Sequence, residues 1–343
     1  TRQMIGDVLR TQFRVHEAEK NYNNLIGTPR TILGITPETE IAVLENGIDR
    51  PGEMAQLASM SEPDVGVIVS IAPCHLERLR SLEGIAREKG LLLLAVRPDG
   101  WGVINLDSRY ASYFQALVNR SIGYRIGRNA AVWADGLELD ADARPRFTIH
   151  DRHGEWRCEL SVYGRHYVSN ALAAWCVGEI YDVSPENRLK ALAEFHSSWG
   201  RLNRRSGLKG STVLDDVYNA NPASVRAALD TLRHSSAQRR IAVIGDMFDL
   251  GPRANELHLE LGREFLDYGA DLLVTLGPLA QNVAEGAIES GMPQDRVFRC
   301  ESHEEVASRI AELIGEGDLV LVKASRGMAM EKVVERIVAS ETM

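Results

Sequence analysis

The sequence predicts an α/β protein of two domains, in which a Rossmann-like, doubly wound sheet forms the second domain. Three observations carry this prediction. The chain has 343 residues, which is more than one ordinary core uses. Its second half alternates short apolar runs with helical patterns, as parallel sheets with crossover helices do. Its first half holds similar runs and a segment that alternates like an antiparallel hairpin.

The first half is predicted to be an α/β unit with a β-rich insertion. Buried strands are expected at residues 40–47, 64–73 and 101–107. Residues 147–164 alternate and contain a turn at Asp151–Gly154, which predicts a hairpin. Helices are expected at residues 166–181 and 185–195. The segment 197–207 is rich in Gly, Ser and charge and is the predicted linker, so we expect domains at 1–200 and 201–343.

The second half is predicted to be one doubly wound sheet. Its expected strands are residues 211–217, 240–246, 271–277, 296–300 and 318–324. Helical patterns separate them: one begins at Pro222, one ends at Gly269 and one ends at Gly315. This alternation implies right-handed crossovers with helices on both faces.

The composition favours a soluble cytoplasmic protein. The formal net charge is -9, which gives no electrostatic reason to bind nucleic acid or an anionic membrane. The longest apolar run, residues 90–96, is far shorter than the ~20 residues that span a bilayer. The four cysteines have no metal-binding spacing, and we expect them to be reduced. We expect a monomer without a membrane span.

Candidate ligands follow two of the expected strands. Glu45 lies at the end of the first strand and is suited to a hard cation, although a solvated loop carboxylate is the plainer alternative. His75 follows the next strand, so both side chains could converge on one ion, although His75 could simply cap a turn. Lys89 lies in an apolar helix, where a buried lysine would be a candidate for modification unless it extends to solvent.

Further polar candidates surround the expected domain junction. Asn170, one turn into a helix, offers a donor and an acceptor that suit an adenine edge, although ordinary helix polarity also explains it. Arg201 lies at the junction and can clamp a phosphate. Asp215 and Asp216 end a strand, where carboxylates can accept hydrogen bonds from ribose hydroxyls, and the string NANP starts the next helix.

In this order the motifs resemble the Mur ligase family. They are ENGIDRPGE, HLE, SLEG, SNALAA, GRL, DDVYNANPAS, IAVIGDM and VLVKASRGM. The strings DDVYNANPASVRAAL, GDMFDLG and VKASRGMAMEKVVE are most similar to the member that joins D-alanyl-D-alanine to UDP-N-acetylmuramoyl-tripeptide, and NYNNLIGTP resembles its loop after the first helix. The resemblance covers essentially the whole chain and implies a P-loop-type central ATPase domain followed by the Rossmann-like domain.

The resemblance implies ATP and Mg²⁺ as cofactors and assigns roles to individual residues. Implied catalytic residues are Lys89, His75 and Arg201. Implied Mg²⁺ ligands are Glu45, His75 and, once carbamylated, Lys89. Implied ATP contacts are Asn170, Arg201, Asp216, Tyr218 and Asn219. Implied substrate contacts are Asn23, Asn24, Lys323, Ser325 and Arg326.

The implied reaction belongs to peptidoglycan precursor synthesis. The tripeptide carboxylate would attack the γ-phosphate of ATP to give an acyl phosphate, and the amine of D-alanyl-D-alanine would then attack that carbonyl. Such phosphoryl transfer depends mainly on positioning and charge neutralisation. Domain closure about Arg201–Leu202 is expected to bring the reactants together.

The sequence departs from the family in two places. The family's GxxGK[ST] phosphate loop does not occur in these 343 residues, and residues 1–10 resemble the helix that follows it. We therefore expect a truncated chain that begins with Thr1, lacks the first strand and the uridine-nucleotide domain, and is inactive by itself. Tyr167 stands where the family usually has Asn, which weakens the adenine assignment.

Three other interpretations remain open at this point. A folylpolyglutamate or cyanophycin synthetase would share the metal and hinge features, but not YNANP together with GDMFDLG. A non-catalytic binding module that has lost its phosphate loop is a second alternative. A nicotinamide dehydrogenase is disfavoured because AVIGDMFDLG contains no GxGxxG.

Overall fold

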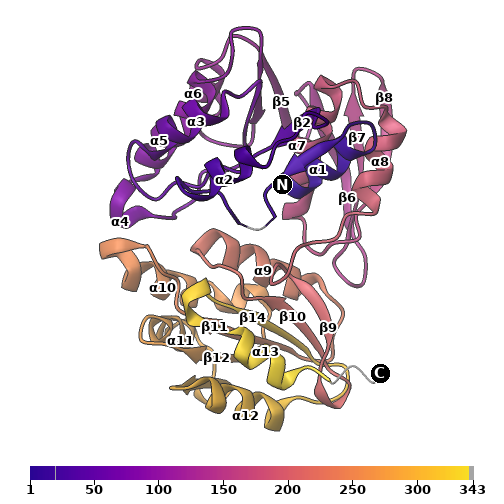
Figure 1. Ribbon diagram of the computed structural model, residues 1–343. Coiled ribbons are helices and arrows are strands. Elements are labelled where there is room, and N and C mark those ends of the chain that lie inside the picture. Colours follow the sequence, from indigo (N-terminus) through magenta and orange to yellow (C-terminus); the bar gives the residue numbers. More distant parts are fainter. Residues whose placement is uncertain (20, 340–343) are drawn as a thin grey trace. The chain divides into compact units, whose positions relative to one another are not determined.

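The computed structural model describes residues 1–19 and 21–339 and divides into two compact units (Figure 1). Unit 1 holds Thr1–Glu138, Pro145–Ser161 and His166–Phe195. Unit 2 holds Leu139–Arg144, Val162–Arg165 and the chain from His196 onward. Helices and strands alternate in both units, so the expected α/β class is confirmed. None of the helices in the described ranges has the length and apolar character that crossing a membrane requires.

A mixed, six-stranded sheet forms the centre of unit 1. In spatial order its strands are β3 (Val65–Ile68), β4 (Trp101–Asn105), β5 (Ser121–Ile126), β6 (Val132–Leu139), β7 (Pro145–Asp151) and β8 (Gly154–Glu159). Strands β3 to β6 pair in parallel, whereas β7 and β8 form an antiparallel hairpin. The predicted hairpin and the strand within 101–107 are therefore confirmed, while β5 and β6 were not predicted.

A separate two-stranded parallel sheet corrects one prediction. Strand β2 (Ile41–Val43) pairs only with β1 (Val15–Glu17), not with β3. Only Val43 of β2 is buried. The expectation that the segments before Glu45 and His75 are buried neighbours in one sheet was wrong. The sequence VHE of β1 carries no apolar strand pattern, so the partner of β2 could not be recognised.

Helices surround the sheets of unit 1. They are α1 (Arg2–Arg10), α2 (Gly27–Leu33), α3 (Glu53–Ser61), α4 (Leu76–Leu79), α5 (Leu82–Leu94), α6 (Ala111–Gln115), α7 (His166–Ile180) and α8 (Pro185–Ala193). Most residues of α7 are buried, because it packs between α1 and the strands β4 and β5. This central place explains why the string SNALAAWCVG is apolar on every face.

A buried carboxylate joins the hairpin of unit 1 to its helices. Asp151, whose side chain is fully buried, accepts hydrogen bonds from the indole N–H groups of Trp156 at 3.2 Å and Trp175 at 2.9 Å. Arg188 of α8 lies 3.4 Å from the same carboxylate. Burial alone would raise the pKa of Asp151, but the hydrogen bonds and the Arg188 charge together lower it.

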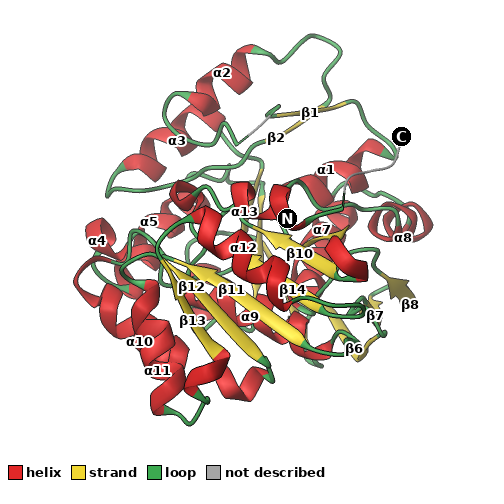
Figure 2. Cartoon of the chain, turned by 90° about the horizontal axis from the view of Figure 1, so that it is seen from below, coloured by secondary structure: helices red, strands yellow, loops and turns green. Residues whose placement is uncertain are grey.

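Unit 2 is built on a sheet whose spatial order is β13-β12-β11-β14-β10-β9 (Figure 2). The strands are β9 (Asn203–Ser206), β10 (Thr212–Asp216), β11 (Arg240–Gly245), β12 (Leu272–Leu276), β13 (Val297–Cys300) and β14 (Leu319–Lys323). Strands β10 to β14 are parallel, as predicted. The prediction of a linker at residues 197–207 was partly wrong, because β9 lies within this segment and pairs antiparallel with β10 at the edge of the sheet.

Helices cover both faces of the second sheet. They are α9 (Pro222–His234), α10 (Ala254–Arg263), α11 (Ala280–Glu289), α12 (His303–Leu313) and α13 (Glu331–Ile337). Residues of α12 and α13 share one buried cluster with β10, β11, β12 and β14. Right-handed crossovers place α9 to α11 on the opposite face. The doubly wound prediction is therefore confirmed.

The helix expected to end at Gly269 is shorter than predicted. Helix α10 ends at Arg263, and a short 3-10 helix, Phe265–Tyr268, completes the segment. The tighter turn accompanies full burial of Phe265. Gly269 then takes the left-handed conformation, with φ 64°, that ends such segments.

We expect Asp151→Ala to lower the free energy of unfolding of unit 1 by about 3–5 kcal/mol at pH 7, because it leaves the buried Arg188 charge without this carboxylate. The pKa of Asp151 is lowered in the folded state, so its contribution is present above about pH 4 and is lost as the pH falls through the folded pKa. Urea unfolding followed by tryptophan fluorescence at pH 7 and at pH about 3 measures both effects.

Asp135→Ala is the matched control for this experiment. Asp135 lies on the neighbouring strand β6 with a 39% exposed side chain and pairs with His150. An exposed pair is worth about 0–1 kcal/mol. If both variants lost the same free energy of unfolding at pH 7, the buried Asp151 contacts would stabilise the hairpin no more than an exposed pair does.

Candidate functional site

The candidate site of unit 2 lies at the carboxyl edge of its parallel strands. Strand β14 is placed between β10 and β11, although it follows both in sequence. From β11 the chain adds β12 and β13 in one direction across the sheet, and it then returns to place β14 beside β10. Open α/β sheets bind ligands outside the carboxyl ends of the strands at such a reversal. Functional side chains are therefore expected in the loops after β10, β11 and β14.

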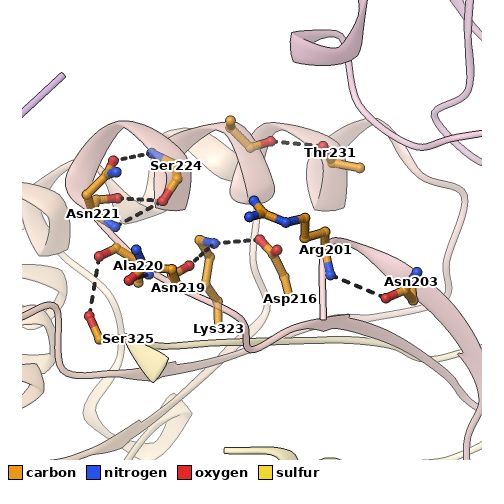
Figure 3. A network of polar contacts seen from close by, with 11 residues as sticks. Arg201, Asn203, Asp216, Asn219, Ala220, Asn221, Ser224, Thr231, Lys323 and Ser325 are labelled. Carbon is orange, nitrogen blue, oxygen red and sulfur yellow. Dashed lines mark hydrogen bonds and ion pairs between the residues drawn. The ribbon is translucent and has the colours of Figure 1, made fainter. Parts of the chain in front are cut away.

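A buried ion pair joins the last residues of β10 and β14 (Figure 3). Asp216 and Lys323 lie opposite each other in the register of the two strands. The Lys323 Nζ donates to Asp216 Oδ2 at 2.6 Å and to the carbonyl oxygen of Asn219 at 2.9 Å. Lys323 is 2% exposed, whereas the Asp216 side chain keeps 12% exposure. The predicted residues Asp216, Asn219 and Lys323 therefore lie together.

The loop after β10 is closed by a helix cap. The Asn221 side chain accepts from the backbone N–H of Ser224 at 2.9 Å, and Ser224 Oγ accepts from the backbone N–H of Asn221 at 3.0 Å. Pro222 occupies the first turn of α9. This reciprocal cap satisfies exposed helix N–H groups and fixes the path of residues 217–221.

Ser325 connects all three loops. Its hydroxyl oxygen accepts from the backbone N–H of Phe248 at 2.8 Å, and its O–H donates to the carbonyl of Ala220 at 3.3 Å. Its own backbone N–H donates to the carbonyl of Asp246 at 3.0 Å. Ser325 is 4% exposed, so in this structure it holds the loops together. Its predicted contact with substrate stays a prediction.

Asp246, at the end of β11, was missed by the sequence analysis. Its Oδ1 accepts from the backbone N–H of Ala280 at 2.7 Å, and burial raises its pKa. His258 supports the same loop: its Nε2 accepts from the backbone N–H of Met247 at 2.9 Å, while Nδ1 lies 2.6 Å from the carbonyl of Ala254. The string GDM at a strand end was the available signal.

Arg201 lies against the same loop. Its guanidinium carbon is 4.2 Å from the centre of the Tyr218 ring, and the Gly200 carbonyl accepts from the backbone N–H of Tyr218 at 3.0 Å. Gly200 has φ 68°, and a Cβ there would lie 3.1 Å from the Tyr218 nitrogen. Leu202 is buried and left-handed, with φ 54°. Figure 3 shows Arg201 along the same sheet edge as Asp216.

Arg326 is the exposed member of the loop after β14. Its Nη1 donates to Glu331 at 2.7 Å, and its guanidinium carbon lies 5.0 Å from the centre of the Trp199 ring. Arg326 and Trp199 are 54% and 48% exposed. Trp199 was not among the predicted site residues. Arg326 is therefore better placed to meet a ligand than Lys323 or Ser325.

In unit 1, the loop carrying Asn23 contacts the Glu45 loop. The Asn23 amide donates to Glu45 Oε1 at 2.9 Å, and the Asn23 carbonyl accepts from the backbone N–H of Gly47 at 2.6 Å. Arg2 Nε lies 4.0 Å from Glu45. Asn24 turns its side chain to the start of α2, where it accepts from the backbone N–H groups of Ile26 and Gly27. The structure thus brings Asn23 and Glu45 together.

His75 occupies a strained position before α4. It has φ 53°, in the left-handed region that few non-glycine residues adopt. Its Nδ1 lies 3.4 Å from Asp49, which also pairs with Arg78. The structure pairs His75 with Asp49, and no described contact joins it to Glu45. Backbone strain of this kind is common at functional sites, but it identifies no ligand.

Lys89 is half-buried, which favours the alternative that its side chain extends to solvent. Its side chain reaches the surface and donates to the carbonyl of Ser70 at 3.2 Å. The neighbouring Glu88 is the buried residue, at 7% exposure, and accepts from the backbone N–H of Met54 at 2.9 Å. Consecutive helical residues point about 100° apart, so only one of this pair can face the core. Glu88 does so because it can bind the N-terminus of α3.

The donor set of unit 1 fits only a partly hydrated cation. Within residues 1–19 and 21–339, no three His, Cys, Asp or Glu side chains are arranged to hold a metal. Mg²⁺ often takes just one or two carboxylates and completes its shell with water and phosphate oxygens. Glu45, with a 44% exposed side chain, is compatible with that mode of binding. The chemistry therefore fits Mg²⁺, and the ligand set stays a prediction.

Asn170 lies on the buried helix α7 and keeps partial exposure. Its Oδ1 accepts from the Thr1 hydroxyl at 2.6 Å. Tyr167, one turn earlier, is 7% exposed and packs against Phe195, with ring centres 6.2 Å apart. Tyr167 therefore belongs to the core here, which explains how a ring can replace a smaller polar residue.

Comparisons with known proteins agree with the motif order. A family model described as the Mur ligase middle domain matches residues 1–178, and one described as the Mur ligase, glutamate ligase domain matches residues 200–326. The UDP-N-acetylmuramoyl-tripeptide--D-alanyl-D-alanine ligase of Bacillus subtilis (strain 168) is 31% identical over 99% of this chain and 73% of its own length. The Mycobacterium leprae enzyme of the same name is 32% identical over 96% and 69%.

A solved structure shows the same architecture. Crystal structure I of MurF from Acinetobacter baumannii superposes with a TM-score of 0.89 at 26% identity, covering 97% of this chain and 72% of that one. Mixed α/β sheets in this arrangement are therefore shared with that protein.

A second acidic residue of β10, Asp215, is 1% exposed and lies 3.7 Å from Arg205 of β9. Burial raises the pKa of Asp215 to about 6, although the Arg205 charge opposes the shift. Its Oδ1 has no hydrogen-bond partner among the described residues. Asp215 thus faces the side of the sheet that α13 covers, away from the Asp216 carboxylate, since adjacent strand residues point to opposite faces.

We expect Asp215→Asn to remove part of the pH dependence of stability. Folded Asp215 keeps its proton up to pH about 6, whereas the unfolded chain loses it near pH about 4. The folded state binds more protons between these values, so the free energy of unfolding should fall as the pH rises through them, by roughly 2–3 kcal/mol. Urea unfolding of both proteins from pH 4 to 8 tests this. Parallel curves for the two proteins would contradict it.

Proposed function

This chain belongs to the Mur ligase family, and from that premise we propose that it joins D-alanyl-D-alanine to UDP-N-acetylmuramoyl-tripeptide in peptidoglycan precursor synthesis. Members of the family are ATP-dependent ligases. Relatives that carry the name of this specific activity are similar to nearly the whole chain. The motifs DDVYNANPAS and VKASRGM, which favour this member, form the buried framework of the unit 2 site.

One observation supports the proposal most directly. Arg201 stacks on Tyr218, and Tyr218 lies two residues after Asp216 in the loop that Lys323 holds. A guanidinium that lies over a ring can still donate through its N–H groups to an anion such as phosphate. The nearby Asp216 carboxylate keeps 12% exposure and can accept from hydroxyl donors. The pair Arg201 and Asp216 therefore has the chemistry to bind a phosphate and a ribose, with Asn170 assigned to adenine.

The reaction asks for little covalent chemistry from the protein. The tripeptide carboxylate attacks the γ-phosphorus of ATP, the bond to the β-γ bridging oxygen breaks, and ADP leaves. The amine of the dipeptide then attacks the acyl phosphate, releasing inorganic phosphate and a proton. Arg201 neutralises developing phosphate charge, and such electrostatic stabilisation is commonly the largest catalytic term.

Residues of unit 1 would hold the metal. Glu45 and His75 are proposed for one Mg²⁺, and Lys89 for a second after carbamylation. Bound Mg²⁺ would supply charge neutralisation at the phosphates. The surface position of Lys89 is compatible with access of CO₂ to its amine. Asn23, which already holds Glu45, is proposed to act with Asn24 near the nucleotide-sugar peptide.

The remaining assignments follow the same premise. Arg326 is the exposed residue proposed to meet the substrates in unit 2. We also propose a cytoplasmic monomer whose family domains divide near residue 200. We propose no nucleic-acid partner, because a net charge of -9 gives no electrostatic reason to bind one and none of the proposed substrates is a nucleic acid.

We expect the 343-residue chain to bind ADP, and Arg201→Met to weaken that binding about tenfold, because it removes a charge-assisted hydrogen bond to phosphate. Arg309→Met is the matched control, since Arg309 also lies over a ring, that of Phe298, but far along the chain on α12. Isothermal titration calorimetry compares the three proteins. Equal losses for both variants, or undetectable ADP binding, would argue against the assignment.

We further expect the 343-residue chain by itself to release no ADP when given ATP, Mg²⁺, tripeptide substrate and D-alanyl-D-alanine. These residues contain no GxxGK[ST] loop, whose backbone N–H groups and lysine would hold the β- and γ-phosphates. A coupled assay for ADP measures this, with a complete Mur ligase as the positive control. Turnover close to that of the control would refute the expectation.

A further inference from the structure

We propose that Lys323 is a positioning residue, which holds the Asp216 carboxylate ready for the ribose of a bound adenine nucleotide. This inference rests on the proposed function, which places a nucleotide at Asp216. It differs from the role that resemblance alone gave Lys323, a contact with the substrates. The reason for the change is where the structure puts the amine.

The Lys323 amine is enclosed by protein. The residue is 2% exposed at the end of the central strand β14. A buried ammonium is costly unless it is paired and hydrogen-bonded. Two of its three N–H donors have protein acceptors, Asp216 Oδ2 and the Asn219 carbonyl. An amine held in this way has little freedom to reach an incoming amino acid or peptide.

The pair leaves part of Asp216 open. Among the described residues only its Oδ2 has a hydrogen-bond partner, and that partner is Lys323. Its side chain is 12% exposed, compared with 2% for Lys323. The second oxygen, Oδ1, can therefore accept from a hydroxyl group at the surface. An ammonium on one oxygen fixes the rotamer that presents the other, which is preorganisation of a ligand-binding group.

Lys323 also fixes the loop that carries the other predicted nucleotide contacts. Its bond to the Asn219 carbonyl holds the chain one residue after Tyr218, on which Arg201 stacks. The same loop is also held by the bond from the Tyr218 N–H to the Gly200 carbonyl and by the Asn221–Ser224 cap, so loss of the amine should act mainly on Asp216. The effect on nucleotide binding should then pass through Asp216 and its hydroxyl partner.

Two ligands distinguish this role from a general loss of structure. The probes are ADP and 2′,3′-dideoxy-ADP, which lacks both ribose hydroxyls, and calorimetry measures their binding to the 343-residue chain. Wild-type protein should prefer ADP by about tenfold, the worth of one to two hydrogen bonds. Lys323→Met should lose most of this preference: ADP should bind about tenfold more weakly, while dideoxy-ADP changes less than twofold.

A double-mutant cycle gives the second test. In an Asp216→Asn background, Lys323→Met should change ADP affinity less than twofold, because the residue through which it acts is already altered. This double variant also avoids leaving a buried carboxylate without its cation. Thermal unfolding of every variant checks that the fold is retained.

The outcomes distinguish failure of the Lys323 positioning role from failure of the proposed nucleotide site. Equal weakening of both ligands by Lys323→Met, unchanged ADP binding, or a full additional loss in the Asp216→Asn background would overturn the positioning role. If the wild-type chain binds neither ligand, the proposed nucleotide site itself fails, and the inference fails with it. Loss of the ADP preference in Lys323→Met, together with the absent effect in the double variant, would establish the role.

Discussion

The buried Lys323–Asp216 pair is the contact on which the unit 2 site depends. A charge at 2% exposure in the middle of a sheet requires a partner, and the opposing residue of β10 supplies it at 2.6 Å. The pair joins the last residues of β10 and β14, so it fixes the point at which the chain leaves the sheet after each of these strands. The same amine reaches Asn219, so the direction of the following loop is set by the same contact.

The two units present their candidate residues in different ways. In unit 2, buried side chains such as Ser325 and Asp246 bond to the backbone of neighbouring loops, which limits how far the edge can deform. In unit 1, Glu45 and His75 are held by half-exposed partners, and they follow strands of different sheets. A ligand would therefore meet a preformed edge in unit 2, whereas in unit 1 it must compete with existing polar contacts.

The sequence predicted the elements that have strong periodicity. Apolar runs bounded by Gly or Asp identified all the parallel strands of unit 2, because such strands are buried on both faces. Short edge strands were missed, since β1 and β9 are polar and acquire their structure only from a partner. Motif order identified the residues that gather around Asp216. It could not show that Glu88 is buried while Lys89 is only half-buried, because the helix orientation depends on tertiary packing.

The short motif at the end of β14 contains side chains of two kinds, buried ones that bond to protein groups and an exposed one. Lys323 and Ser325 turn inward and satisfy groups of three loops, whereas Arg326 turns outward onto Trp199 and keeps 54% exposure. A chain with net charge -9 would need local cations to bind the anionic substrates proposed for it. The inward lysine cannot supply that attraction, because its charge is already matched by Asp216. Arg201 and Arg326 are exposed, and each guanidinium lies over a ring, so these two arginines are better placed to attract an anion. The separation of buried, matched charge from exposed, stacked charge is therefore the feature of this sheet edge that best supports the proposed binding of a nucleotide and a peptide acid.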